Sequence, residues 1–255
     1  MESIPPPDPG RLRIFTGSSP RIDRGRLLMP LLLATIMSAA LVPVSTLFDV
    51  SISRWFLQQN LPGDFVKSIE LAEFYSHGIG VLFIILLAFR MAPQRRWCLP
   101  RLATLAFGAG AVAELVKAFV LRSRPSNLNL EIASYDAAWR WTFDWSLEHV
   151  AAFSSGVRSF PSGHAAIATG LSIGLCLMFP RGRLIFLLFL ALAMLQRLAC
   201  FAHFTSDLMG GLALGLIWTY ICLSPHLLGA LFDKIEPEGA GFERKRKPVQ
   251  YKSAA

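Results

Sequence analysis

The sequence predicts an all-α protein, an integral membrane bundle of six transmembrane helices with interfacial helices in its outer loops. Of the 255 residues, 53% are hydrophobic and only 16% are charged, and the mean hydropathy is +0.47. Such a composition is too apolar for a soluble domain. The apolar residues also come in runs of about 20, the helical length that crosses a hydrocarbon core of about 30 Å.

Six apolar runs account for the predicted spans, at residues 27–48, 71–89, 102–121, 165–179, 184–201 and 208–223. The first three runs are the clearest, whereas the fourth is short and the fifth contains Gln196 and Arg197. These two polar residues weaken the hydropathy signal but indicate function. Gly211 and Gly215 in the last run have the spacing of small residues that allows two helices to pack closely.

Basic residues predict the orientation of the spans. Arginine and lysine gather before the first run, between the second and third, between the fourth and fifth, and in the C-terminal tail. With six crossings these groups share one side, which the positive-inside rule makes cytoplasmic. We therefore expect a bacterial inner-membrane protein with both termini in the cytoplasm. This topology explains the net charge of +8, so no nucleic-acid partner is predicted.

The chain divides into one membrane domain and two tails. Residues 1–26 are rich in proline and are predicted to be a disordered cytoplasmic tail. The six spans occupy residues 27–228, and residues 229–255 form a basic cytoplasmic tail. A cleaved signal peptide is disfavoured, because the first apolar run continues to Phe48 and its loss would upset the charge pattern. The four cysteines lack the spacing of a zinc site or a disulfide framework.

Two connections are predicted at the outer face. Residues 49–70 mix apolar and polar side chains, so part of this segment is expected to lie in the membrane interface. Residues 122–160 form the longest connection and contain Trp139, Trp141 and Trp145. Tryptophan prefers the headgroup level. These residues are expected to combine an interfacial belt with a lid or a wall of the lipid entrance.

A first polar stretch ends the third apolar run. Lys117 lies close to the outer end of that run, and Arg124 and Pro125 follow it. Lys117 forms either a structural ion pair with Glu114, one turn earlier, or half of an anion grip with Arg124.

A second polar stretch opens the fourth run. Its sequence is Pro161, Ser162, Gly163 and His164. Proline suits the first turn of a helix, and glycine lets a ligand approach the backbone closely. The free N–H groups and the positive end of the helix dipole make this start a seat for phosphate.

A third polar stretch follows the fifth run and contains Arg197, His203 and Asp207. His203 and Asp207 are four residues apart, so the carboxylate can hold one imidazole nitrogen. The other nitrogen then remains free to attack an electrophile.

Taken together, the polar stretches predict phosphoryl transfer. The three cations and the helix start oppose the roughly two negative charges of a phosphate monoester. His203 would attack phosphorus, and His164 would protonate the departing oxygen and later activate water. A metal site built from His164, His203 and Asp207 is disfavoured, because the neighbouring cations would repel the metal. No metal and no cofactor are expected.

These residues resemble the three-part signature of the type 2 phosphatidic acid phosphatase (PAP2) superfamily, K-x6-R-P, P-S-G-H and S-R-x5-H-x3-D. The motifs cover residues 117–207, and the six-span layout extends the likeness over the domain at 27–228. The resemblance implies a metal-independent membrane lipid phosphatase with His203, His164 and Asp207 as catalytic residues. It assigns phosphate binding to the other matched residues, Lys117, Arg124, Ser162, Gly163 and Arg197.

One position departs from the signature, because Gln196 stands where the family has serine. We expect its amide to replace the hydroxyl as a hydrogen-bond partner for the phosphate or for Asp207. This change can alter the shape of the pocket and thereby the choice of substrate.

The predicted reaction is the dephosphorylation of a lipid phosphate or diphosphate at the periplasmic face, through a phosphohistidine. Candidate substrates are undecaprenyl diphosphate, phosphatidylglycerol phosphate, phosphatidic acid and lipid A phosphates, and the motifs do not choose among them. The alternatives are a lipid phosphotransferase with the same site and a non-catalytic anion transporter. Membrane lipids are the expected surroundings, and the sequence leaves the oligomeric state open.

Overall fold

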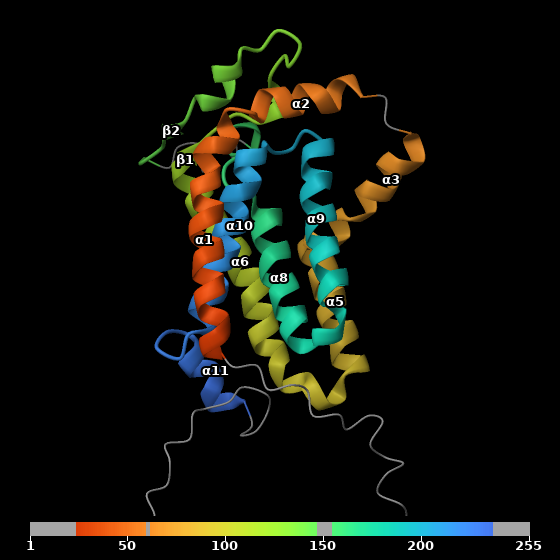
Figure 1. Ribbon diagram of the computed structural model, residues 1–255, viewed down its shortest axis with the longest axis vertical. Coiled ribbons are helices and arrows are strands. Elements are labelled where there is room, and N and C mark those ends of the chain that lie inside the picture. The colour runs from red at the N-terminus through yellow and green to blue at the C-terminus, as the bar shows by residue number, and fades with distance from the viewer. Residues whose placement is uncertain (1–23, 60–61, 147–154, 237–255) are drawn as a thin grey trace, which may run out of the picture.

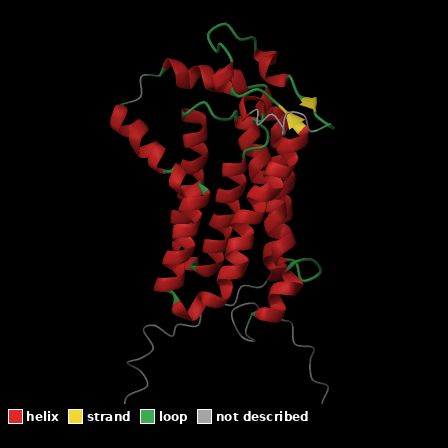
Figure 2. Cartoon of the chain, turned by 180° about the vertical axis from the view of Figure 1, so that it is seen from behind, coloured by secondary structure: helices red, strands yellow, loops and turns green. Residues whose placement is uncertain are grey.

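The computed structural model describes residues 24–59, 62–146 and 155–236, and it is a bundle of roughly parallel and antiparallel helices (Figures 1 and 2). The bundle consists of α1 (Arg24–Thr46), α5 (Gly78–Met91), α6 (Leu99–Phe119), α8 (Gly163–Met178), α9 (Arg183–Ala199) and α10 (Thr205–Leu223). The shorter helices are α2 (Asp49–Gln58), α3 (Gly63–Leu71), α4 (Glu73–Ser76) and α11 (Gly229–Ile235). The predictions for residues 1–23 and 237–255 fall outside the described residues.

Short irregular segments connect the helices. The 3-10 turns are η2 (Pro93–Cys98), η3 (Pro125–Asn127), η4 (Tyr135–Trp139), η5 (Ser155–Val157) and η6 (Pro180–Gly182). Strands β1 (Val120–Leu121) and β2 (Thr142–Phe143) pair antiparallel, with Val120 opposite Phe143. This small ribbon holds the start of the long connection against the end of α6.

Helix α8 is the centre of the bundle, since α6, α9 and α10 all pack against it. Small residues make these contacts close. A Cβ atom on Gly170 would lie 2.0 Å from the Leu105 carbonyl oxygen of α6, and one on Gly211 would lie 2.3 Å from the Ser162 carbonyl oxygen. The predicted close packing at Gly211 and Gly215 is confirmed, because Gly215 likewise faces the Ala166 carbonyl oxygen of α8. Helix α1 covers the outer side of α10.

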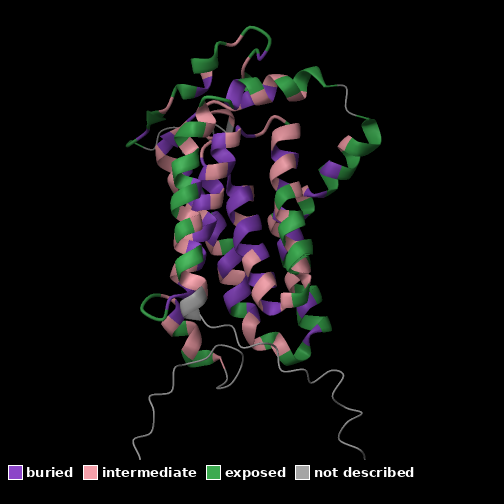
Figure 3. Cartoon of the chain, viewed as in Figure 1, coloured by how far each residue is buried: buried purple, intermediate pink, exposed green. Residues whose placement is uncertain are grey.

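Many large hydrophobic side chains of the bundle helices are exposed, as expected for a protein within lipid. The exposed residues lie on the outward faces of the helices (Figure 3). Among the described residues, four helical stretches are long and apolar enough to cross a membrane: Leu27–Thr46, Pro93–Phe119, Pro180–Ala199 and Thr205–Leu223. A fifth follows if the bent pair Gly63–Ser76 and Gly78–Met91 is one span. Helix α8 is apolar but has only 16 residues. The chain is thus a multi-pass helical bundle, and the number of six spans stays a prediction.

The second predicted span, 71–89, is not one continuous helix. It breaks at His77, whose backbone is extended (φ −85°, ψ 140°), and the two flanking segments are bent by 70°. Gly80 permits this bend, because a Cβ there would lie 1.7 Å from the Phe74 carbonyl oxygen. Hydropathy averaged over the whole run did not show the break, although Glu73, Ser76 and His77 interrupt its apolar residues. As a result α3 leans away from the bundle axis (Figure 1).

The two ends of the bundle differ in character. The basic turns η2 and η6 lie at the end opposite to α2 (Figure 1). At that end Arg101 is buried and pairs with Asp233 at 3.0 Å and with Glu236 at 2.7 Å, which fastens α11 to α6. The polar stretches of the signature lie at the α2 end.

Candidate active site

Residues from the three polar stretches line one cavity of about 390 Å³ at the α2 end of the bundle. The sequence-predicted residues in its wall are Lys117, Arg124, Gly163, His164, Arg197 and His203. The central sequence-based expectation, that these distant segments converge, agrees with this geometry. Ser162 and Asp207 do not line the cavity, because both are completely buried behind it.

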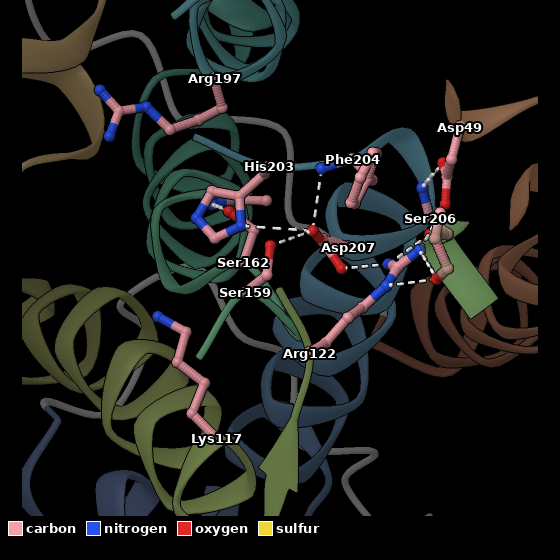
Figure 4. A network of polar contacts seen from close by, with 12 residues as sticks. Asp49, Lys117, Arg122, Ser159, Ser162, Arg197, His203, Phe204, Ser206 and Asp207 are labelled. Atoms are coloured by element: carbon pink, nitrogen blue, oxygen red, sulfur yellow. Dashed lines mark hydrogen bonds and ion pairs between the residues drawn. The ribbon is translucent and has the colours of Figure 1, made fainter. Parts of the chain in front are cut away.

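Lys117 projects from the last turn of α6 toward the start of α8 (Figure 4). Its Nζ atom lies 2.6 Å from Glu114 Oε1, so the ion pair considered from sequence is present. Lys117 still lines the cavity, and a Cβ on Gly163 would lie only 3.3 Å from its Nζ. The absence of a side chain on Gly163 therefore lets the ammonium group reach the helix start. Structural pairing and anion binding are compatible for this residue.

The loop that carries Arg124 is held by backbone hydrogen bonds. Arg124 N donates to Gly156 O at 3.1 Å, and Ser126 N donates to Phe201 O at 3.1 Å. The first contact joins this loop to the end of the long connection, and the second joins it to the turn before His203. Arg124 is thus fixed beside the third polar stretch.

Ser162 begins helix α8 and connects two of the motifs. Its Oγ accepts a hydrogen bond from Ala165 N at 3.3 Å, which caps the helix. Its own N–H donates to Asp207 O at 3.0 Å. The phosphate contact of Ser162 stays a prediction, whereas Gly163 and His164 line the cavity.

His203 lies in the turn between α9 and α10, buried except for the face that lines the cavity. Its Nδ1 lies 3.6 Å from Asp207 Oδ2, longer than a normal hydrogen bond, and has no hydrogen-bond partner among the described residues. Removal from water lowers the pKa of His203 below its usual value, although the neighbouring Asp207 acts in the opposite sense. The imidazole is consequently neutral near pH 7 and can act as a nucleophile through Nε2.

Asp207 is held by neighbours of its own. Its Oδ2 accepts hydrogen bonds from Ser159 Oγ at 2.6 Å and from Phe204 N at 2.8 Å. These donors fix the carboxylate, so Asp207 can orient the His203 ring with little freedom of its own.

The comparison with known proteins agrees with this geometry. The family model described as "PAP2 superfamily" matches residues 97–227, just over half of the chain. The chain belongs to the PAP2 superfamily. The matched segment runs from η2 to beyond α10 and so contains every residue of the PAP2 signature.

Two curated relatives and one solved structure show partial likeness. A lipid A 1-phosphatase of Rhizobium johnstonii is 28% identical over 51% of this chain and 49% of its own length. A lipid A 1-phosphatase of Rhizobium etli is 26% identical over 56% of each chain. This chain therefore aligns with about half the length of these relatives. The crystal structure of a PAP2-type phosphatidylglycerolphosphate phosphatase from Bacillus subtilis is 19% identical, with a TM-score of 0.49 over 83% of this chain and 98% of that one.

Arg122 extends the PAP2 site beyond its signature (Figure 4). It is buried and lies between two completely buried carboxylates: it pairs with Asp207 through Nη1 and with Asp49 Oδ2 through Nη2 at 2.6 Å. It also donates to Ser206 Oγ at 2.7 Å. Burial raises the pKa of Asp49, whereas Arg122 and Ser206 lower it. The sequence analysis missed this network, although a charged residue between Lys117 and Arg124 was a signal for it.

Arg197 contacts Glu73 and Gln196, and of these two residues the sequence indicated only Gln196. Its Nη2 lies 2.8 Å from Glu73 Oε1, and its Nε donates to Gln196 Oε1. Gln196 Nε2 in turn donates to Glu73 Oε2 at 3.3 Å. Of the two partners expected for the Gln196 amide, Asp207 is wrong, because the side chain points from α9 toward Glu73 of α4 instead. A contact of Gln196 with the phosphate stays a prediction. Arg197 Nη1 remains beside His164 Nε2, at 3.4 Å.

Arg158 is a further cation in the cavity wall that the sequence analysis did not name. Its Nη2 lies 3.4 Å from Glu114 Oε2, and its backbone bridges to that of Arg122. No spacing rule singles it out, since it lies outside the motifs. Within the described residues, no group of three histidine, cysteine or acidic side chains is placed to hold a metal ion.

Proposed function

We propose that this protein is a membrane lipid phosphatase that hydrolyses a phosphate monoester or diphosphate through a phosphohistidine. The observation that carries the proposal is the shared cavity, in whose wall two histidines lie among the cations Lys117, Arg124 and Arg197. Membership of the PAP2 superfamily and the partial likeness to two lipid A 1-phosphatases support it.

In the first step, His203 Nε2 attacks phosphorus and forms an N–P bond while the bond from phosphorus to the lipid oxygen breaks. The departing oxygen takes a proton from His164, whose protonated form is favoured by the negative phosphate beside it. The cations neutralise the charge of the transferring group. Asp207 stabilises the His203 ring as the ring becomes positively charged.

In the second step, water attacks the phosphohistidine and gives a proton to His164. The N–P bond breaks, inorganic phosphate leaves, and His203 returns to its neutral form. The steps use side chains in the cavity wall together with Asp207 behind it, and none of them draws on a metal ion. We expect activity without a metal ion, because the cations already supply the positive charge with which a metal would neutralise the phosphoryl group.

The cavity supports an amphiphilic substrate. Its polar end carries the histidines and cations, and its other wall is formed by Phe107, Gly110, Ala111 and Ile167 of α6 and α8. A phosphate group fits the polar end of the cavity. The adjoining part of the lipid headgroup fits against the wall formed by α6 and α8. Because the relatives that align with half of this chain are lipid A 1-phosphatases, a lipid A 1-phosphate is the first candidate.

We place this site at the periplasmic face of a bacterial inner membrane. The placement rests on the positive-inside rule, since the basic turns η2 and η6 lie at the opposite end of the bundle. Both termini would then be cytoplasmic.

The test is phosphate release from a panel of lipid phosphates by the purified protein, in detergent with EDTA and without an added acceptor. The panel comprises lipid A 1-phosphate, phosphatidic acid, phosphatidylglycerol phosphate and undecaprenyl diphosphate. We expect release from at least one of them, and a loss of at least about 10⁴-fold in His203→Ala with an unchanged unfolding temperature.

Three results would contradict the proposal: no release from any lipid, activity that EDTA abolishes and a divalent metal restores, or activity that survives in His203→Ala. Phosphate transfer only when an alcohol acceptor is added would indicate a phosphotransferase instead.

A further inference from the structure

Glu73 brings a carboxylate to the site from a segment that the PAP2 signature does not include. It begins α4, the four-residue helix at the bend between α3 and α5. The bend directs its side chain toward the end of α9, where Oε1 lies 2.8 Å from Arg197 Nη2. Glu73 is thus a second-span residue that contacts a third-motif cation.

Gln196 closes a cycle with these two residues. Its Oε1 accepts from Arg197 Nε, and its Nε2 donates to Glu73 Oε2 at 3.3 Å. Gln196 and Arg197 are both buried, and the Glu73 side chain is 43% exposed. A serine at position 196 is too short to contact both partners. In this chain, the glutamine that departs from the family signature contacts Glu73.

The cycle fixes the direction of the remaining guanidinium edge. A guanidinium is planar, with five N–H groups at fixed angles. Contacts at Nε and Nη2 leave Nη1 beside His164 Nε2, at 3.4 Å. This orientation requires no rearrangement when the phosphoryl group arrives, which is the condition for strong electrostatic stabilisation of a transition state.

We propose that Glu73 and Gln196 form a clamp that orients Arg197 toward the transferring phosphoryl group, which makes Glu73 a positioning residue of this enzyme. The inference rests on the proposed function and adds a residue to it. Glu73 has a second electrostatic effect, since a carboxylate near the cavity repels a phosphate dianion. The clamp requires that positioning outweighs this repulsion, so the two effects predict opposite results when Glu73 is removed.

The experiment compares Glu73→Ala and Gln196→Ser, singly and together, with the wild type. Glu70→Ala is the matched control, because Glu70 is an exposed glutamate one turn earlier, outside the cavity wall. The readouts are kcat and KM for the best lipid of the panel, and the affinity for vanadate measured by the shift of the unfolding temperature. Vanadate binding reports on the phosphate seat without requiring turnover.

We expect Glu73→Ala to lower kcat/KM and vanadate affinity each by about tenfold, the effect of losing one hydrogen bond to a charged group. Glu70→Ala should match the wild type. The double variant should lose about as much as the worse single variant, because either change opens the same cycle. If Glu73→Ala does not fold, Glu73→Gln, which preserves the size of the side chain, should still weaken vanadate binding.

Unchanged or tighter vanadate binding in both Glu73 variants would overturn the clamp, as would strictly additive losses in the double variant. These outcomes are separable from failure of the proposed function. A wild-type protein that releases phosphate while Glu73→Ala behaves like Glu70→Ala refutes the clamp alone. A wild-type protein that releases no phosphate refutes the proposed phosphatase activity. The vanadate affinity of the Glu73 variants then still decides whether Glu73 positions Arg197.

Discussion

At the scale of single residues, a chain of buried charges supports the imidazole of His203, the proposed nucleophile. His203 contacts Asp207, Asp207 contacts Arg122, and Arg122 contacts Asp49. The chain runs from the cavity to the start of α2. It fixes the position of His203 relative to an element far away in sequence.

Replacement of Arg122 by methionine tests this chain. The change leaves two buried carboxylates without their shared cation, and we expect it to lower the free energy of unfolding by about 3–5 kcal/mol. Arg122→Lys preserves the charge but not the guanidinium group that contacts both carboxylates, so its free energy of unfolding should fall by less. Denaturant unfolding in detergent provides the measurement, with the exposed Arg140→Met as control. A loss below about 1 kcal/mol in Arg122→Met would show that the network is not structural.

The burial of His203 predicts an acid-tolerant nucleophile. Its pKa is lowered, so the ring stays neutral below the ordinary histidine value of about 6.5 and becomes protonated only as the pH falls through the lowered pKa. The acid limb of kcat/KM due to this group should therefore lie below about pH 6.5.

The pKa can be measured by NMR of protein with ¹³C-labelled histidine, in which His203→Ala identifies the resonance. Asp207→Asn should lower the pKa further, since the carboxylate favours the protonated ring. Titration of His203 at or above pH 6.5 in the wild type would contradict this expectation.

The residues that sequence analysis identified are those whose chemistry shows in local spacing. Lys117, His164 and His203 lie in short polar stretches beside apolar runs. A charge or an imidazole is energetically costly there, so its presence indicates function. Glu73 and Asp49 gave no such signal, because their roles depend on which helices meet in three dimensions. Their partners are 73 to 157 residues away along the chain.

At the scale of elements, the packing of α10 against α8 joins the second and third motifs. Gly211 faces the Ser162 carbonyl oxygen, and in the same region Ser162 N donates to Asp207 O. The helix contact therefore sets the distance between the predicted phosphate site at the start of α8 and the carboxylate of Asp207 beside His203.

Gly211→Ala should disturb this contact. A Cβ at 2.3 Å from backbone oxygen must push the two helices apart, which we expect to lower the free energy of unfolding by about 1–3 kcal/mol. A small displacement at the site should also lower kcat/KM by about tenfold to a hundredfold. Gly63→Ala is the control, since a Cβ there has no atom within 4 Å. Unfolding and turnover are measured on the same preparations, and equal behaviour of the two variants would refute the argument.

The elements were predicted to different degrees. The ends of α1, α9 and α10 agree with the apolar runs within a few residues, because long apolar stretches are unambiguous. The break at His77 was missed, because hydropathy averages over the position where the backbone becomes extended. The glycines at 78 and 80 were its signal, and their meaning becomes clear only when the Phe74 carbonyl oxygen is seen beside Gly80.

At the scale of the whole molecule, the distribution of basic residues predicts the sidedness of the site. In a cysteine-free background, Asn129→Cys at the site end should react with a membrane-impermeant maleimide in intact spheroplasts. Gln94→Cys in η2 should react only after the membrane is permeabilised. Both side chains are exposed, so a difference in labelling reports topology. The reverse pattern would place the cavity in the cytoplasm.

The size of the cavity has a consequence for how the protein would encounter its substrate. A space of about 390 Å³ accommodates a phosphate and part of a sugar or glycerol, but not the hydrocarbon chains of a lipid. The chains would stay among neighbouring lipids while the headgroup reacts, so their number and length are not recognised in this cavity. Encounters would then be governed by two-dimensional diffusion, and the abundance that matters is the fraction of the leaflet area that the phosphorylated lipid occupies.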